Sequence, residues 1–223
     1  MSQSGAKQQL VEAIRMLERA EIIDHNGHCS VRRDATSFFI NSGASVRSAL
    51  TVDDIVAVDF DGNLVEGEAR PPLEFHIHSE IYRRRPDVNA VAHTHPKWST
   101  FLTMTGAPFK VVYAQAALLG DIPLLDSPLS INTKPMGEKL AATLGQGPAA
   151  LLKAHGVVVV GADMIECFAL AAYVEENAYR QYMAMQIGEP YVFSAEEQAV
   201  SREKLRAANL LKKTWDHYRS KLA

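Results

Sequence analysis

Short apolar segments joined by tight turns recur along this chain, and they restrict the sheet that it can form. Residues 55–60 have a strand-like pattern, the strong turn signal Asp61-Gly62-Asn63 follows, and residues 64–65 are apolar again. Residues 150–153 and 157–160 are two further apolar runs on either side of a tight turn. Turns this short join antiparallel neighbours, and predicted helices are interspersed among them. We therefore expect a mixed or antiparallel sheet with helices packed on it.

Helical patterns fill much of the remaining sequence. Residues 8–23 place apolar side chains on one face, and residues 73–85 follow two prolines, which are tolerated in the first turn of a helix. Asp163 is predicted to cap a long helix that reaches about residue 187, and a polar helical tail starts at about residue 195. Because 223 residues suit one core, we assign residues 1–223 to a single domain with this tail at its end.

The charge and hydropathy patterns exclude several classes of protein. The 26 acidic and 23 basic residues include no long basic run, which argues against nucleic acid as a partner. No apolar run approaches the roughly 20 residues needed to cross a bilayer, and the first residues lack a signal-peptide core. Two cysteines do not make a disulfide scaffold. We expect a cytoplasmic protein with free thiols and no membrane partner. A small anionic substrate stays compatible with the net charge of −3, because local charge at a site can oppose it.

Three histidines are placed where a catalytic metal site would need them. His93 and His95 end a predicted strand, and residues two apart on a strand point to the same side. His155 lies in a sharp turn just before Gly156. Three imidazoles with an open fourth position are typical of catalytic rather than structural metal sites. The alternative is that His155 only ends a strand and bonds to the backbone.

A carboxylate and further histidines lie nearby in the sequence. Glu74 stands at the start of a predicted helix, where it can act as a general acid or base or can simply cap the helix. His76 and His78 share that helix, and by position they are more typical of packing or surface histidines than of ligands. His28 lies in a loop after Gly27, from which a side chain can contact substrate.

These residues together resemble the class II aldolase/adducin family. Residues 86–96, which contain His93-Thr94-His95, are similar to the core signature of the family, and residues 152–157 are similar to its second signature. The spacing from Glu74 to the histidines, residues 27–32 and Ser42-Gly43 also fit, so the resemblance covers roughly residues 8–190.

The resemblance implies a three-layer α/β/α sandwich around a mostly antiparallel sheet, in a homotetramer with sites between subunits. It implies one divalent metal ion per subunit, Zn²⁺ or Mn²⁺, held by His93, His95 and His155. Glu74 matches the acid/base residue of the family. Tyr113 falls where some members offer a tyrosine to the site of the neighbouring subunit.

Departures from the family pattern favour one reaction over another. Members that act on sugar phosphates carry asparagine in place of His28 and serines in place of Pro72 and Leu73. Neither replacement at 72 and 73 offers a hydroxyl. The sequence therefore favours a decarboxylase of an aromatic or heteroaromatic acid with a hydroxyl ortho to the carboxylate. The alternative is an aldolase or epimerase acting on a sugar phosphate or related hydroxy-carbonyl compound. A non-enzymatic scaffold, as in adducin, would be expected to lose metal ligands that this chain keeps.

The decarboxylase hypothesis assigns a role to each remaining candidate. The ortho-hydroxy carboxylate would chelate the metal, which acts as a Lewis acid, and Glu74 or His28 would protonate the ring carbon. Ser42, Gly43 and Arg32 would bind a second carboxylate.

Overall fold

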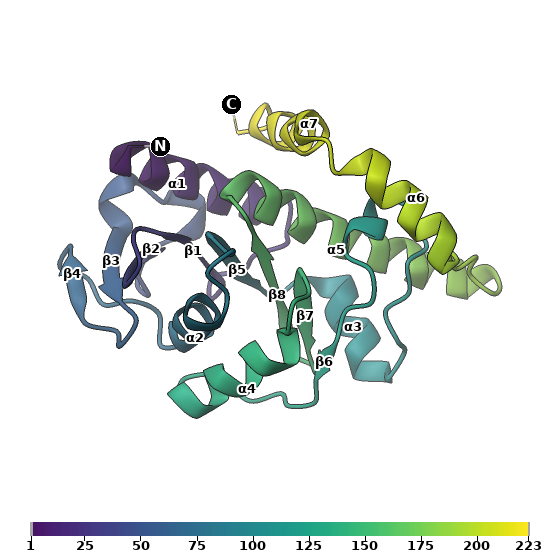
Figure 1. The fold of residues 1–223 in the computed structure, drawn as a ribbon, viewed down its shortest axis with the longest axis horizontal. Helices are drawn as coiled ribbons and strands as arrows, with labels where there is room; N and C mark the ends of the chain where they lie inside the picture. The colour runs from purple at the N-terminus through teal and green to yellow at the C-terminus, as the bar shows by residue number, and fades with distance from the viewer. Residues whose placement is uncertain (1, 223) are drawn as a thin grey trace.

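A single sheet of eight strands runs through the middle of the molecule within residues 2–222, the part of the chain that the computed structural model describes (Figure 1). Every neighbouring pair is antiparallel except β6 and β7, which are parallel. The sheet is therefore mostly antiparallel, as expected. In spatial order its strands are β4 (Leu64–Glu66), β3 (Ile55–Asp59), β2 (Ser37–Asn41), β1 (His28–Arg32), β5 (Ala90–Thr94), β8 (Gly156–Gly161), β7 (Ala149–Leu152) and β6 (Leu124–Leu125).

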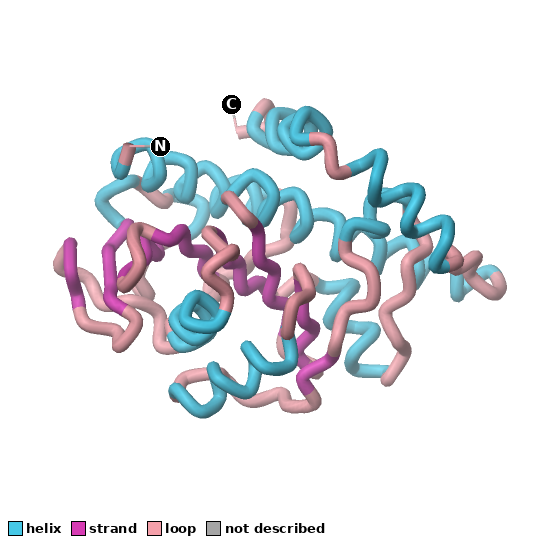
Figure 2. Tube along the Cα trace, in the orientation of Figure 1, coloured by secondary structure: helices cyan, strands magenta, loops and turns pink. Residues whose placement is uncertain are grey.

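Helices cover both faces of this sheet, which gives the three layers that were predicted (Figure 2). One face carries α1 (Gln3–Arg19), α3 (Lys97–Thr105) and α5 (Met164–Ile187), and the other carries α2 (His76–Arg84) and α4 (Lys134–Leu144). The tail forms α6 (Ala195–Leu205) and α7 (Ala208–Arg219), and α7 packs against α5. Three short 3₁₀ segments, η1 (Arg47–Ala49), η2 (Val52–Asp54) and η3 (Ala114–Leu118), lie in the connections.

The central strands are apolar on both faces because both faces are buried. On β5, Ala90 and Ala92 pack with α1 and α5, whereas Val91 between them packs with α2 and α4. On β8, Val157 and Val159 belong to the first core, and Val158 and Val160 belong to the second. This alternation follows from the two-residue period of a strand, and it explains why these strands are continuous apolar runs in the sequence.

The predicted helix over residues 73–85 starts later than expected, at His76. Residues before it form a turn in which the Phe75 N–H donates to the Pro72 carbonyl at 3.1 Å. Glu74 therefore precedes the helix, and its carboxylate accepts hydrogen bonds from Ser130 and Ile131 instead of capping α2. The first helix also starts earlier than predicted, at Gln3, and ends earlier, at Arg19.

Cys29 and Cys167 are buried free cysteines. Within residues 2–222, no helix has both the length and the apolar composition that a membrane span requires.

A carboxylate on α5 caps the helix that follows the histidine pair. Glu175 accepts hydrogen bonds from the backbone N–H groups of Trp98 and Ser99 at 2.8 and 3.0 Å. These donors belong to the first turn of α3, where the helix itself supplies no partner. Glu175→Ala is expected to lower the free energy of unfolding by about 1–3 kcal/mol in urea denaturation. The matched control is Glu176→Ala, which removes a neighbouring carboxylate that pairs with Arg180 on the surface. Equal effects of the two substitutions would contradict the capping role.

Candidate metal centre

Three strands and one turn bring the histidines together. His93 is on β5 and fully buried, and His95 follows directly after β5 ends at Thr94. β8 pairs with β5 so that Thr94 lies opposite Val157. This places the β7–β8 turn, which carries His155, at the same end of the sheet. A Cβ atom on Gly156 would lie 2.2 Å from the Thr94 carbonyl oxygen. Only glycine permits this close approach, so Gly156 fixes the position of His155.

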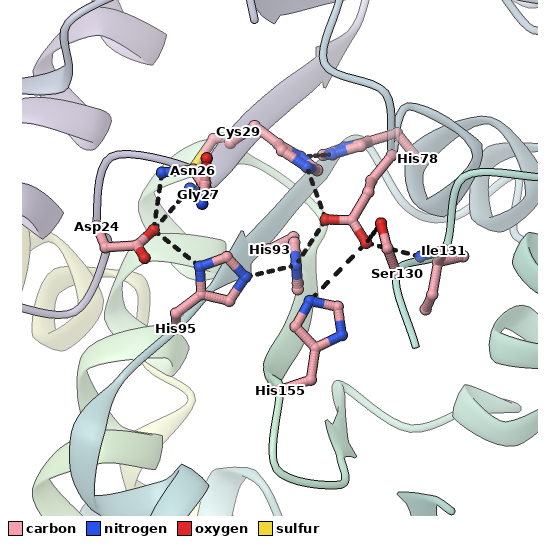
Figure 3. A network of polar contacts seen from close by, with 12 residues as sticks. Asp24, Asn26, Gly27, Cys29, His78, His93, His95, Ser130, Ile131 and His155 are labelled. Atoms are coloured by element: carbon pink, nitrogen blue, oxygen red, sulfur yellow. Dashed lines mark hydrogen bonds and ion pairs between the residues drawn. The ribbon is translucent and has the colours of Figure 1, made fainter. Parts of the chain in front are cut away.

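The ligand atoms of four side chains gather at this point, and Figure 3 shows the three imidazoles directed toward one another. The Nε2 atoms of His93 and His95 are 3.0 Å apart. The Glu74 oxygens lie 3.5 Å from His93 Nε2 and 3.8 Å from His155 Nε2. The potential ligand atoms of all four residues lie within 4.8 Å of one another. The sequence anticipated this group, including the distant residues 74 and 155.

Hydrogen bonds behind two of the imidazoles orient them for metal binding. His93 Nδ1 donates to the Val157 carbonyl at 3.2 Å, and His95 Nδ1 donates to the Asp24 carboxylate at 2.8 Å. With the proton on Nδ1, each Nε2 presents a lone pair to the other. Burial also lowers the pKa of His93 to about 3, so this imidazole is neutral at physiological pH. Two facing lone pairs repel unless a cation lies between them, so the donor set fits a divalent metal ion.

Asp24 is a contributor that the sequence reasoning missed. Its carboxylate accepts the Nδ1–H of His95 and the backbone N–H groups of Asn26 and Gly27, each of these two at 2.9 Å (Figure 3). Burial opposes its ionisation, but the bond from His95 and those backbone bonds outweigh this effect and lower its pKa. A carboxylate–histidine pair behind a metal is a common arrangement. The only signal in the sequence is an acidic residue in a glycine-containing loop.

Asp24→Asn is expected to weaken metal binding about 10- to 100-fold, because the amide keeps a hydrogen-bond acceptor but loses the charge that makes His95 a better ligand. Competition with a chelator of known affinity measures the change. The exposed Asp53→Asn substitution is the control. Unchanged affinity in Asp24→Asn would show that Asp24 does not act through His95.

Glu74 is held in the cavity by partners from another segment. Its Oε1 atom accepts from Ser130 Oγ at 2.9 Å and from the Ile131 N–H at 2.7 Å. Burial alone would raise the pKa of Glu74, but the neighbouring His28 and His93 and the Ile131 bond outweigh it and keep the carboxyl well below its usual pKa. Glu74 is therefore ionised. It is available either as a further ligand or as a base.

His28 is on β1, and its imidazole lies next to the Glu74 carboxylate. Its Nε2 atom is 3.9 Å from Glu74 Oε2, and its Nδ1 atom is 2.6 Å from His78 Nε2. Burial lowers the pKa of His28. His78, whose position in the sequence suggested packing or surface exposure, is completely buried on α2 and contacts His28 instead of the ligand cluster.

A cavity of about 710 Å³ opens over these residues. Pro72, Leu73 and Gly43 line it, together with His28, Glu74, His95 and His155. Gly43 is thus at the predicted place, although its N–H already donates to the Arg70 carbonyl at 3.0 Å. Ser42 is buried beside Gly43 and is not among the lining residues.

The structure corrects the assignment of Arg32. Its guanidinium donates to the backbone carbonyls of Val88, Tyr82 and Arg85, at the C-terminal end of α2. Its donors therefore stabilise a helix end and do not reach the cavity. The cation that lines the cavity is Arg47, which the sequence reasoning missed. Arg47 donates through Nε to the Gly27 carbonyl at 2.7 Å.

Tyr113 lies outside this cavity. It stands before η3, and the Arg180 guanidinium lies 4.4 Å from the centre of its ring. It also borders a separate hollow beside α5 and α7. Tyr113 therefore does not contact the site of its own chain, and its predicted contribution to a neighbouring subunit remains a prediction.

Comparisons with known proteins agree with this architecture. A profile of the Class II Aldolase and Adducin N-terminal domain matches residues 8–182. The chain is 30% identical over 181 residues to the 5-methylthioribulose-1-phosphate/5-deoxyribulose-1-phosphate aldolase of Rhodospirillum rubrum, covering 81% of each chain. It is also 30% identical to the L-fuculose phosphate aldolase of Escherichia coli, covering 82% of this chain and 86% of that one.

A similar fold occurs among solved structures. The L-fuculose 1-phosphate aldolase from Glaciozyma antarctica PI12 superposes with a TM-score of 0.86 at 23% identity, covering 98% of this chain and 88% of that one. At this identity the likeness concerns the fold, which is the helix-flanked, mostly antiparallel sheet described above.

Proposed function

The chain belongs to the class II aldolase and adducin family, and from this premise we propose that it is a metal-dependent aldolase that cleaves a phosphorylated ketose or a related hydroxy-carbonyl compound. The observation that carries the proposal is the cluster of the Glu74 carboxylate with three imidazoles, of which Glu74, His95 and His155 line one cavity and His93 is buried beside them. The curated relatives named above are aldolases. They support the aldolase alternative that the sequence left open over the decarboxylase that it favoured.

His93, His95 and His155 would hold the metal in this proposal. A divalent ion bound there supplies Lewis-acid stabilisation of the negative charge that develops next to a carbonyl carbon. Its identity, Zn²⁺ or Mn²⁺, is open, because imidazoles and a carboxylate suit either ion.

Glu74 would carry the proton transfer. In aldol cleavage a base removes the proton of a hydroxyl, the adjacent carbon–carbon bond breaks, and its electron pair is later protonated at carbon. Glu74 is ionised, lies beside the ligand cluster and is steadied by Ser130 and Ile131, so its carboxylate is placed to accept and return such a proton.

Arg47 would attract the anionic end of the substrate. It lines the cavity, as do Pro72 and Leu73, neither of which offers a hydroxyl. We therefore expect weaker recognition of phosphate than two serines would give, and a preference for substrates with an apolar group near the anion. We further propose a homotetramer with sites between subunits, in line with the exposed Leu73, which lines the cavity, and the exposed Leu129, which stands between the lining residues Pro128 and Ser130.

A decarboxylase remains the second candidate, because the apolar wall and His28 suit a ring acid. The deciding experiment treats the protein with chelator, reloads it with Zn²⁺ or Mn²⁺ and supplies two panels. Ketose 1-phosphates are assayed for aldehyde release, and hydroxylated aromatic and pyridine carboxylates are assayed for CO₂. Metal-dependent aldehyde release supports the aldolase. Metal-dependent CO₂ release without aldehyde would overturn it in favour of the decarboxylase.

A further inference from the structure

A line of four buried polar side chains runs from the cavity into the core. His28 Nδ1 is 2.6 Å from His78 Nε2, His78 Nδ1 is 2.6 Å from Ser30 Oγ, and Ser30 Oγ is 2.8 Å from Tyr82 Oη. All four residues are at most 2% exposed. Two of them alternate on β1 and two lie one turn apart on α2, so the periods of the strand and the helix bring them into one row.

The two ends of this row differ. Within residues 2–222, Ser30 is the one hydrogen-bond partner of the Tyr82 hydroxyl. At the other end, His28 Nε2 has no hydrogen-bond partner among the described residues and belongs to a residue that lines the cavity. The row therefore starts at a buried phenol and ends at a buried nitrogen facing the site.

Counting the donors and acceptors of the four side chains determines which group donates in each hydrogen bond of the row. If the Tyr82 hydroxyl donates its proton to Ser30 Oγ, the Ser30 hydroxyl can donate its own proton to His78 Nδ1. His78 then carries its proton on Nε2 and donates it to His28 Nδ1. The opposite direction would leave the buried Tyr82 proton without an acceptor, which costs about 1–3 kcal/mol. In the first direction every proton between two members of the row has an acceptor, and the one remaining proton, on His28 Nε2, belongs to a residue that lines the cavity and lies 3.9 Å from the Glu74 carboxylate.

The consequence concerns His28. Because its Nδ1 accepts from His78, its own proton lies on Nε2, toward the cavity and 3.9 Å from the Glu74 carboxylate. The aromatic ring of Phe38, stacked on His78 with centroids 6.0 Å apart, helps to fix the orientation of that imidazole.

We propose that His78, Ser30 and Tyr82 are positioning residues that fix His28 as a neutral Nε2–H donor, which hydrogen-bonds an oxygen of the substrate. This role replaces protonation of a carbon by His28, because a neutral imidazole is a poor acid, and it leaves Glu74 as the acid–base residue. The identity of the oxygen rests on the proposed aldolase function. In an aldolase, this would be the substrate oxygen that gains negative charge during cleavage. The tautomer does not depend on that function.

The first test reads the tautomer directly. The full-length protein is labelled with ¹⁵N-histidine, and the side-chain ¹⁵N shifts are recorded at neutral pH without substrate, with signals assigned from the His28→Gln spectrum. We expect His28 and His78 both to show a protonated Nε2 and an unprotonated Nδ1. A protonated Nδ1 on His28 would overturn the proposal. Failure of the aldol assay would leave this result unaffected, so the two hypotheses fail separately.

A second labelled protein tests the hydroxyl groups. In the Ser30→Ala/Tyr82→Phe double variant, His78 Nδ1 loses its donor and no lone buried hydroxyl remains. We expect His78 to populate both tautomers, giving a second set of signals. A single unchanged tautomer would overturn the assignment of Ser30 and Tyr82 as positioning residues.

Kinetics test the donor role. His28→Leu removes the N–H and is expected to lower kcat about 10²- to 10³-fold. His28→Gln keeps an amide N–H but cannot transfer a proton, and it is expected to stay within about tenfold of the unsubstituted enzyme, the effect of one weakened hydrogen bond. Equal losses in both variants would mean that His28 moves a proton, which contradicts the proposal.

Discussion

Replacing His93 by alanine is expected to remove bound metal and activity together. His93 is fully buried, and its Nδ1–H is fixed by the Val157 carbonyl so that Nε2 faces His95. Removing His93 from the proposed ligand set should weaken metal binding by more than the roughly 10- to 100-fold expected when a residue hydrogen-bonded behind a ligand is lost. Activity should fall about 10³-fold or more, because a Lewis-acid metal supplies several kcal/mol of charge stabilisation. Elemental analysis of the purified protein and turnover of the metal-reloaded protein measure the two effects.

The control for this substitution is His217→Ala, which removes an exposed imidazole on α7 that does not line the cavity. Because His93 is buried, thermal unfolding of His93→Ala is measured alongside to separate loss of metal from loss of the fold. A folded His93→Ala protein that retains one metal per subunit and full turnover would contradict the metal centre described here.

Glu74→Gln is expected to lower kcat about 10²- to 10⁴-fold while the metal content stays unchanged. The glutamine oxygen can keep the bonds from Ser130 and Ile131, so the side chain should remain in place. Three imidazoles remain to hold the metal, whereas the amide cannot accept and return a proton. The measurement is kcat together with metal per subunit for the same preparation.

The matched control is Glu68→Gln, which changes an exposed carboxylate a few residues earlier in the chain. If Glu74→Gln loses metal in proportion to activity, Glu74 acts as a ligand more than as a base. If it loses neither, the acid–base role is wrong.

The residues that line the cavity influence which substrates can bind there. Pro72 and Leu73 stand there without hydroxyl groups, and the Gly43 N–H is already bonded to Arg70. Arg47 offers charge in the same cavity, but its Nε already donates to the Gly27 carbonyl. Of these features, the missing hydroxyl groups at Pro72 and Leu73 are the ones that favour a ring acid on sequence grounds. In an aldolase the same features would shape which substituent lies next to the anionic group, so they do not by themselves select the reaction.

The sequence by itself determined the elements and the histidine cluster. Strand periodicity predicted that His93, on β5, and His95, just after its end, point to the same side, and the Gly156 turn between two apolar runs marked His155. The cap at Asp163 and the end of α5 at Ile187 were also predicted, because caps and breaks depend on neighbouring residues. These signals are local, so one sequence suffices to recognise them.

Only the tertiary structure decided which distant groups complete the site. Asp24 reaches His95 across 71 positions, and His78 reaches His28 across 50, through the pairing of β1 with β5 and the packing of α2 on the sheet. Because of the same packing, Arg32 donates to a backbone carbonyl near the end of α2, whereas Arg47 lines the cavity. Long-range contacts of this kind depend on register and on the fit of one layer against another. Local periodicity predicts which face a side chain occupies, but the partner on that face is set by the assembled layers.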